Sequence, residues 1–137
     1  MKETDRFRNL KLLGRGGMGM VYRALDTQRN ESVALKVVRD DHLKDSKIIR
    51  RFEREFKSLA EIDHPNVIRT YEVGKFDDRS FYSMEYVEGQ SIEELLVDGP
   101  LEAKRAVQLA IDICDGLEAV HDIGLTHRDI TPSNVMV

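Results

Sequence analysis

A cluster of glycines near the N-terminus constrains the fold of this chain more than any other feature. The segment Gly14-Arg15-Gly16-Gly17-Met18-Gly19 stands between two stretches with the composition of β-strands, residues 7–13 and 20–25. Because glycine has no Cβ, a backbone built from it can come close to a phosphate group. The glycine spacing alone is a weak signal, since an ordinary flexible hairpin can contain the same residues.

The residues that follow the glycines exclude two other nucleotide-binding loops. A dinucleotide-binding fold places a helix directly after its glycines, whereas residues 20–25 have the pattern of a strand. A Walker loop needs Gly-Lys-Ser or Gly-Lys-Thr, and here Gly19 is followed by Met20 and Val21. What remains is a glycine-rich hairpin between two strands, either a plain turn or a cover for phosphates.

A lysine lies inside the next predicted strand, residues 32–38, which is rich in β-branched side chains. An unpaired charge in a buried strand is costly, so the ammonium of Lys36 needs phosphate oxygens or a carboxylate as its partner. Residues 45–62 carry apolar side chains at helical spacing and predict an amphipathic helix. Its acidic residues are candidate partners: Glu53, Glu55 and Glu61. A lysine in an edge strand would simply be solvated.

The remaining elements complete an α+β pattern. Two further strands are predicted at 67–73 and 80–86, joined by a turn at 74–78. Ser91 and Glu94 form a capping box that opens a short helix. A long helix follows over residues 102–121, and Gly124 ends it. This order favours a small antiparallel sheet with one helix, followed by a helical region.

A third polar cluster lies near the C-terminus. His127-Arg128-Asp129 is followed five residues later by Asn134. An aspartate can orient a hydroxyl nucleophile and accept its proton. An asparagine oxygen can bind Mg²⁺, a hard cation that prefers oxygen ligands. The alternative interpretation of this segment is a polar turn.

Composition narrows the classes of function. The net charge of −4, with both signs interspersed, argues against a dedicated nucleic-acid binder, although it leaves room for a local basic patch. No apolar stretch is long enough to cross a bilayer, so we expect this segment to be cytoplasmic, with an anchor beyond its C-terminus left open. The single cysteine, Cys114, favours a reducing compartment, and its apolar neighbours predict a buried core residue.

Together and in this order, the glycine hairpin, Lys36, Asp129 and Asn134 resemble the protein kinase family. Residues 13–19 look especially like bacterial eukaryotic-type (Hanks-type) serine/threonine kinases, and the resemblance covers residues 7–137. It implies an α+β, kinase-like fold. An N-lobe of five antiparallel strands and one helix, αC, would occupy residues 7–87. The hinge and the beginning of a helical C-lobe would occupy 88–137, and residues 1–6 would form an N-terminal tail.

The resemblance also implies the chemistry: ATP, with Mg²⁺, would donate a phosphoryl group to Ser or Thr hydroxyls of an unidentified protein substrate. Asp129 would be the catalytic base and Asn134 a metal ligand, while His127 would be a packing residue. Lys36 would hold the α- and β-phosphates. Its helix partner would be Glu55, nine residues before His64-Pro65, with Glu53 as the second candidate.

The resemblance also implies a set of nucleotide-binding residues. Val21 and Ala34 would enclose the adenine, Met84 would be the gatekeeper, and the backbones of Glu85 and Val87 would bind the adenine edge. The full set is Leu13, Gly14, Gly16, Gly17, Gly19, Val21, Ala34, Lys36, Met84, Glu85 and Val87. No nucleic-acid partner and no membrane segment are expected within this chain.

Two departures from the family pattern leave alternatives open. Thr131 stands where serine/threonine kinases usually have a lysine that neutralises charge on the γ-phosphate, which keeps a nucleotide-binding pseudokinase or scaffold in consideration. The sequence stops three residues after Asn134, before the family's Asp-Phe-Gly motif. We therefore expect a fragment, truncated after the catalytic loop, that binds ATP but does not complete the transfer alone. An inactive truncated kinase fragment is the further alternative.

Overall fold

The structure of the protein is a computed structural model, which describes residues 3–17, 19–43, 45–76, 79–127 and 129–137. The chain forms two compact units, and each is described by itself. The first comprises Met1–Glu61 and Arg69–Tyr86, and the second comprises Ile62–Ile68 and Val87–Val137. Among the described residues, no helix is both long enough and apolar enough to span a membrane.

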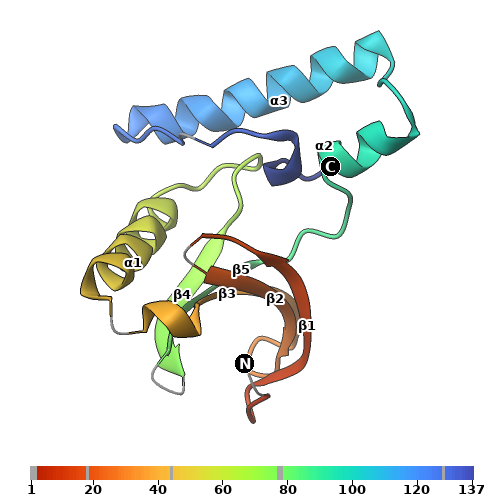
Figure 1. Cartoon of the computed structure of the whole chain (residues 1–137). Helices are drawn as coiled ribbons and strands as arrows, with labels where there is room; N and C mark the ends of the chain where they lie inside the picture. Colours follow the sequence, from red (N-terminus) through yellow and green to blue (C-terminus); the bar gives the residue numbers. More distant parts are fainter. Residues whose placement is uncertain (1–2, 18, 44, 77–78, 128) are drawn as a thin grey trace. The chain divides into compact units, whose positions relative to one another are not determined.

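The first unit is built on an antiparallel sheet of five strands, in the order β1-β2-β3-β5-β4 (Figure 1). This confirms the sheet expected from the sequence. The strands are β1 (Phe7–Arg15), β2 (Gly19–Asp26), β3 (Glu31–Val38), β4 (Thr70–Phe76) and β5 (Arg79–Glu85). β1 extends to Arg15 and β2 begins at Gly19, so both strands include residues of the glycine cluster. The turn between them is therefore shorter than the sequence predicted.

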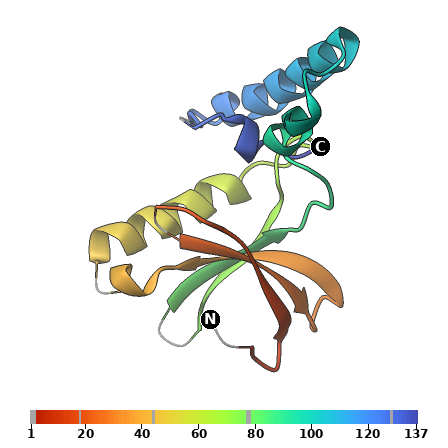
Figure 2. The ribbon, with the colours of Figure 1, turned by 45° about the vertical axis from the view of Figure 1, so that its right-hand side comes forward.

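One face of this sheet forms the main hydrophobic core. Period-2 alternation places Val33, Leu35 and Val37 of β3 on this face, and none of the three has exposed surface. The strands curve around one another, as Figure 2 shows. The rings of Phe7 in β1 and Phe81 in β5 meet edge to face, with centroids 5.4 Å apart. Burial of each large apolar side chain contributes about 1.5–3 kcal/mol.

The opposite face packs against helix α1 (Ser46–Ala60), which confirms the predicted amphipathic helix. Asp45 caps its N-terminus by accepting hydrogen bonds from the backbone N–H groups of Lys47 and Ile48. Phe52 is fully buried against Val38 and Tyr82 of the sheet. A short 3-10 turn, η1 (Asp40–His42), lies between β3 and α1.

The position of β4 differs from the prediction. The strand begins at Thr70 instead of residue 67, and residues 74–76, predicted as part of a turn, pair with β5. Gly74 accounts for the second of these differences, the pairing of residues 74–76. A Cβ at this position would lie 2.9 Å from the ring of Phe81, so the glycine makes room for an aromatic ring within the sheet. Asp77 and Asp78, in the predicted turn, lie outside the described residues.

The second unit is helical. It contains α2 (Ile92–Leu95), η2 (Leu96–Asp98), α3 (Ala103–Asp122) and η3 (Pro132–Asn134). The capping box of Ser91 and Glu94 is present, and Gly124 follows α3 with a φ of +75°, a conformation that favours glycine. The C-terminal segment is held by two backbone hydrogen bonds between Gln90 and Val137.

Helix α3 packs on the segment that follows the His64-Pro65 pair. A Cβ at Gly116 would lie 3.0 Å from the carbonyl oxygen of Asn66, and Asn66 Nδ2 donates to the carbonyl of Asp112 at 2.9 Å. The prediction of a buried Cys114 is wrong, because its side chain is exposed. Val107 and Ile111 are exposed as well. Helical geometry places these three residues on the side of α3 that faces away from Gly116 and Val120.

Candidate active site

The first unit holds Lys36 and Glu55 together as an ion pair. Lys36 lies on β3 and Glu55 on α1, and Lys36 Nζ is 2.5 Å from Glu55 Oε1. The two side chains are 22% and 28% exposed, so the pair lies at the margin of the core with access to solvent. The structure thus joins Lys36 to Glu55, whereas no ion pair of Glu53 with Lys36 is present among the described residues.

A tyrosine that the sequence analysis did not single out completes this group. The hydroxyl of Tyr82, on β5, donates a hydrogen bond to Glu55 Oε1 at 2.6 Å. The same oxygen therefore accepts from both Tyr82 and Lys36. Burial, together with the adjacent Glu55 carboxylate, raises the pKa of the Tyr82 phenol well above its usual range. The hydroxyl accordingly stays protonated and acts as a donor at neutral pH.

Strand register places several predicted nucleotide contacts on one face of the sheet. Lys36 lies opposite Val21 on one side and Tyr82 on the other, and Ala34 lies opposite Met84. Directly opposed residues of antiparallel strands project to the same face. Val21, Ala34, Lys36 and Met84 therefore share a face, as contacts with a single ligand would require. The sequence could suggest this alternation within a strand but not the pairing between strands.

Three other predicted contacts lie at the ends of the sheet or beyond it. Leu13 lies on β1 and is exposed. Glu85 ends β5, and its backbone N–H donates to the carbonyl of Arg69 at 2.8 Å. Val87 is half-buried in the second unit.

The glycines of the hairpin fall into two kinds. A Cβ at Gly19 would lie 2.8 Å from the carbonyl oxygen of Val37, so the close approach of β2 to β3 requires glycine there. Cβ atoms at Gly14 and Gly17 would meet nothing within 4 Å, and one at Gly16 would meet only Gly19 O, at 3.7 Å. Packing does not require glycine at these three positions, so the bare backbone there fits the close approach of a phosphate. Met18 lies outside the described residues.

A histidine that the sequence analysis also missed contacts the hairpin. His42, in η1, places Nε2 3.2 Å from the carbonyl oxygen of Gly17. The two residues are separated by 25 positions in the chain, and no local pattern indicates this contact. Its effect is to tether the tip of the glycine hairpin to the turn that follows β3.

The second unit holds Asp129 and Asn134 together. Asn134 Nδ2 donates to the Asp129 carbonyl at 3.0 Å and to its Oδ2 at 3.1 Å. The packing role expected for His127 is not observed: its side chain is exposed, and Nδ1 accepts from the Asp129 N–H at 3.3 Å, which stabilises the loop locally. Thr131 Oγ1 lies 3.0 Å from Ser133 Oγ. Arg128, of the predicted motif, lies outside the described residues.

The catalytic-loop segment around Asn134 offers few oxygen ligands, so a cation here would be bound mainly by phosphate and water oxygens. Both hydrogen bonds of the Asn134 amide use Nδ2, which leaves Oδ1 for a metal. Among the described residues there is no group of three acidic, histidine or cysteine side chains that could hold a metal ion. Mg²⁺ commonly binds through one or two protein oxygens together with phosphate and water, and Asn134 fits that role.

The local basic patch that the net charge left open lies on α1. It is a shallow hollow lined mainly by basic side chains, namely Lys47, Arg50, Arg51 and Arg54, together with Asp45 and Ile48. None of these residues belongs to the predicted site. The patch therefore adds nothing to the assignment of the chemistry around Lys36.

Comparison with known proteins identifies related sequences that span all the candidate site residues, from the glycine hairpin to Asn134. A family model described as "Protein kinase domain" matches residues 7–137. The serine/threonine-protein kinase PrkC of Bacillus subtilis is 38% identical over 135 residues, which cover 98% of this chain and 21% of that protein. The serine/threonine-protein kinase pkn2 of Myxococcus xanthus is 39% identical over 132 residues, which cover 96% of this chain and 16% of that protein.

A solved structure has the same fold. The crystal structure of the Mycobacterium tuberculosis PknI kinase domain matches with a TM-score of 0.78 and 28% sequence identity. The match covers 100% of this chain and 59% of that one. The chain thus spans between about a sixth and a fifth of the length of the curated relatives named above and more than half of a solved kinase domain.

Proposed function

This chain belongs to the protein kinase family, and on that premise we propose that it is the ATP-binding N-terminal part of a serine/threonine protein kinase. Residues 7–87 would form the N-lobe, 88–137 the hinge and the beginning of the C-lobe, and 1–6 an N-terminal tail. The observation that carries the proposal is the ion pair between Lys36 on β3 and Glu55 on α1. The named relatives are serine/threonine kinases, which supports Ser or Thr as the acceptor.

In the first unit, Lys36 would place its ammonium on the α- and β-phosphates of ATP. Glu55 restricts where that ammonium can lie, because its carboxylate holds Nζ at 2.5 Å. Val21, Ala34 and Met84 would contact the adenine from the same face of the sheet. The backbone of Gly14, Gly16 and Gly17, unobstructed by side chains, would cover the phosphates.

In the second unit, Asp129 would orient the Ser or Thr hydroxyl of the substrate and accept its proton. Its carboxylate is exposed and therefore accessible to a hydroxyl group, and Asn134 fixes its orientation through Nδ2. Mg²⁺, when bound, would supply positive charge beside the transferring phosphoryl group. Asn134 Oδ1 is the ligand that this chain would offer it.

A second candidate function is a nucleotide-binding pseudokinase that acts as a scaffold. Thr131 is the observation that favours it, because a hydroxyl paired with Ser133 provides no positive charge for the γ-phosphate. The two candidates differ in one measurable property. A kinase transfers the phosphoryl group, whereas a scaffold binds ATP with Mg²⁺ and transfers nothing.

The test uses two substitutions in the full-length protein that carries this sequence. We expect Lys36→Met to abolish phosphotransfer and weaken ATP binding. We expect Asp129→Asn to lower kcat by about 10²–10⁴-fold, the usual contribution of a general base, with ATP binding retained. Phosphotransfer is measured with labelled ATP, and binding by calorimetry. Lys75→Met on β4 is the matched control, since Lys75 belongs to no part of the proposed site.

The outcomes separate the two functions. Wild-type activity in either Lys36→Met or Asp129→Asn would refute the residue assignments. A wild-type protein that binds ATP with Mg²⁺ tightly but transfers no phosphate would favour the scaffold.

A further inference from the structure

The hydroxyl of Tyr82 is a donor in the Lys36 site that the proposed function leaves without a role. We propose that Tyr82 is a positioning residue, which holds the Glu55 carboxylate where it can pair with Lys36 and thereby sets the efficiency of phosphotransfer. The inference rests on the proposed function and deepens it. In this proposal, a residue of strand β5 helps to hold helix α1 at the position where Glu55 pairs with Lys36.

The first argument is the burial of the phenol. Tyr82 is 1% exposed, and a buried tyrosine hydroxyl requires a hydrogen-bond partner. Its partner is Glu55 Oε1 at 2.6 Å, which also receives Lys36 Nζ. Glu55 and Lys36 are partly exposed, and an ion pair with access to water holds its geometry weakly. The buried Tyr82 hydroxyl cannot move freely, so its hydrogen bond restricts the Glu55 carboxylate to one position.

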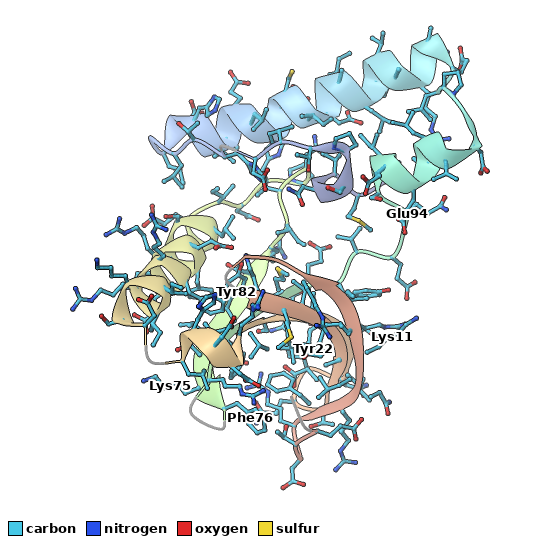
Figure 3. All side chains as sticks on the ribbon, in the orientation of Figure 1. Lys11, Tyr22, Lys75, Phe76, Tyr82 and Glu94 are labelled. Carbon is cyan, nitrogen blue, oxygen red and sulfur yellow. The ribbon has the colours of Figure 1, made fainter. Side chains whose placement is uncertain are left out.

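The second argument is that the ring of Tyr82 fixes the same helix that carries Glu55. Its centroid lies 5.0 Å from the ring of Phe52 and 5.8 Å from that of Phe56. Phe52, Glu55 and Phe56 stand at positions i, i+3 and i+4 and so share one face of α1. Figure 3 labels Tyr82 on the side of the sheet that α1 covers. Tyr82 thus contacts α1 in two ways: its ring packs on Phe52 and Phe56, and its hydroxyl binds the carboxylate of Glu55.

The third argument is the strand register. Tyr82 lies directly opposite Lys36 in the β3–β5 ladder, and Lys36 Nζ is 5.8 Å from the centre of the Tyr82 ring. The two groups that contact Glu55 therefore come from neighbouring positions on the sheet. A shift of α1 along the sheet would stretch both contacts together. The arrangement makes the Lys36–Glu55 pair dependent on the Tyr82 hydroxyl.

The principal test removes only the hydroxyl. In the full-length protein, we expect Tyr82→Phe to lower kcat/KM for ATP by about tenfold, since a hydrogen bond to a charged group is lost while the ring remains. Tyr82→Met, a second variant without a hydroxyl, is expected to lose activity to a similar degree. Tyr71→Phe is the matched control, because Tyr71 is a half-buried tyrosine on β4 whose ring packs on Arg29. We expect its activity to stay within about twofold of wild type.

A double-mutant cycle distinguishes positioning from plain packing. If Tyr82 acts through Glu55, Tyr82→Phe should have almost no further effect in a Glu55→Ala background. If it only packs, the loss should be the same in both backgrounds. Activity of Tyr82→Phe or Tyr82→Met within about twofold of wild type would overturn the inference, and so would equal losses with and without Glu55.

The test can fail without the proposed function failing. Lys36→Met is measured in parallel. If it abolishes phosphotransfer while Tyr82→Phe is fully active, the kinase assignment stands and the role of Tyr82 is refuted. If Lys36→Met retains full activity, the site itself is wrongly assigned, and the inference about Tyr82 falls with it.

Discussion

Asp26 shows what single residues contribute to this fold beyond the site. It ends β2, has no exposed surface and carries a carboxylate. Arg6 pairs with it through two hydrogen bonds, Nε to Oδ1 at 3.0 Å and Nη2 to Oδ2 at 2.7 Å. Oδ1 also accepts from the backbone N–H of Gln28 at 2.9 Å. The carboxylate thus ties the turn after β2 to the residue that precedes β1.

The buried carboxylate of Asp26 should make the free energy of unfolding depend on pH in the acidic range. Burial acts to raise the pKa of its carboxyl, but the hydrogen bonds from Arg6 and Gln28 outweigh this and lower the pKa below its usual range. A lowered folded-state pKa gives a contribution that is fully present above the unfolded value of about 3.9 and is lost as pH falls below that value through the lower folded-state pKa. We expect the free energy of unfolding to drop with acid, and to drop less in Asp26→Asn.

Urea titrations at neutral and at acidic pH measure this effect. At neutral pH we expect Asp26→Asn to destabilise the protein by about 2 kcal/mol, because it weakens a charged hydrogen bond inside the core. Asp41→Asn is the control, since Asp41 pairs with Arg39 at the exposed surface and such pairs contribute little. Equal effects of the two substitutions would contradict the assigned role of Asp26.

At the level of elements, the glycines of the hairpin serve two purposes, strand packing and, in our proposal, phosphate binding. The sequence alone does not show which glycine serves which purpose. Gly19 is needed by the sheet, because β2 approaches β3 too closely for a side chain. Gly17 meets no such restriction, and its carbonyl contacts His42. The same residue type therefore serves folding at one end of the hairpin and, in our proposal, phosphate binding at the other.

Two alanine substitutions separate these requirements. We expect Gly19→Ala to destabilise the protein by about 1–3 kcal/mol, since its Cβ would overlap the Val37 carbonyl. We expect Gly17→Ala to leave stability within about 0.5 kcal/mol but to weaken ATP binding by roughly tenfold. Thermal unfolding and calorimetry measure the two effects. A stability loss in Gly17→Ala as large as that in Gly19→Ala would contradict this division.

At the scale of the whole molecule, the two units bury their apolar residues to different degrees. The sheet of the first unit contains fully buried side chains such as Val33, Leu35 and Val37. In the second unit, α3 buries Val120 but exposes 60% of Val107. The stability of the chain should therefore depend far more on one face of α3 than on the other.

Matched valines on α3 test this expectation in the 137-residue chain. We expect Val120→Ala to lower the free energy of unfolding by about 1.5 kcal/mol, since buried methyl groups are lost. We expect Val107→Ala to change it by less than about 0.5 kcal/mol. Both are measured by urea unfolding followed by circular dichroism. A Val107→Ala loss equal to that of Val120→Ala would show that the outer face of α3 is covered.

Much of the fold was predictable because its signals are local. Helix α1 lies where the helical spacing placed it, and the capping box of Ser91 and Glu94 is present. Four of the strands begin within one residue of the predicted positions, whereas β4 begins three residues later than predicted. β4 also continues through the predicted turn, because Gly74 is a turn residue by composition and a packing residue in the sheet. Cys114 was misassigned since an apolar run does not say which of its side chains face the core.

The sequence by itself determined the order of the elements and the residue types of the site, because periodicity, capping and motif spacing act over short stretches of chain. It also proposed Glu55 as the partner of Lys36, through a resemblance. Only the tertiary structure showed that Tyr82 reaches the same carboxylate oxygen and that His42 contacts the glycine hairpin. It alone buried Asp26 against Arg6. These contacts join residues far apart in the chain, so they are decided by strand register and helix packing, which no local pattern encodes.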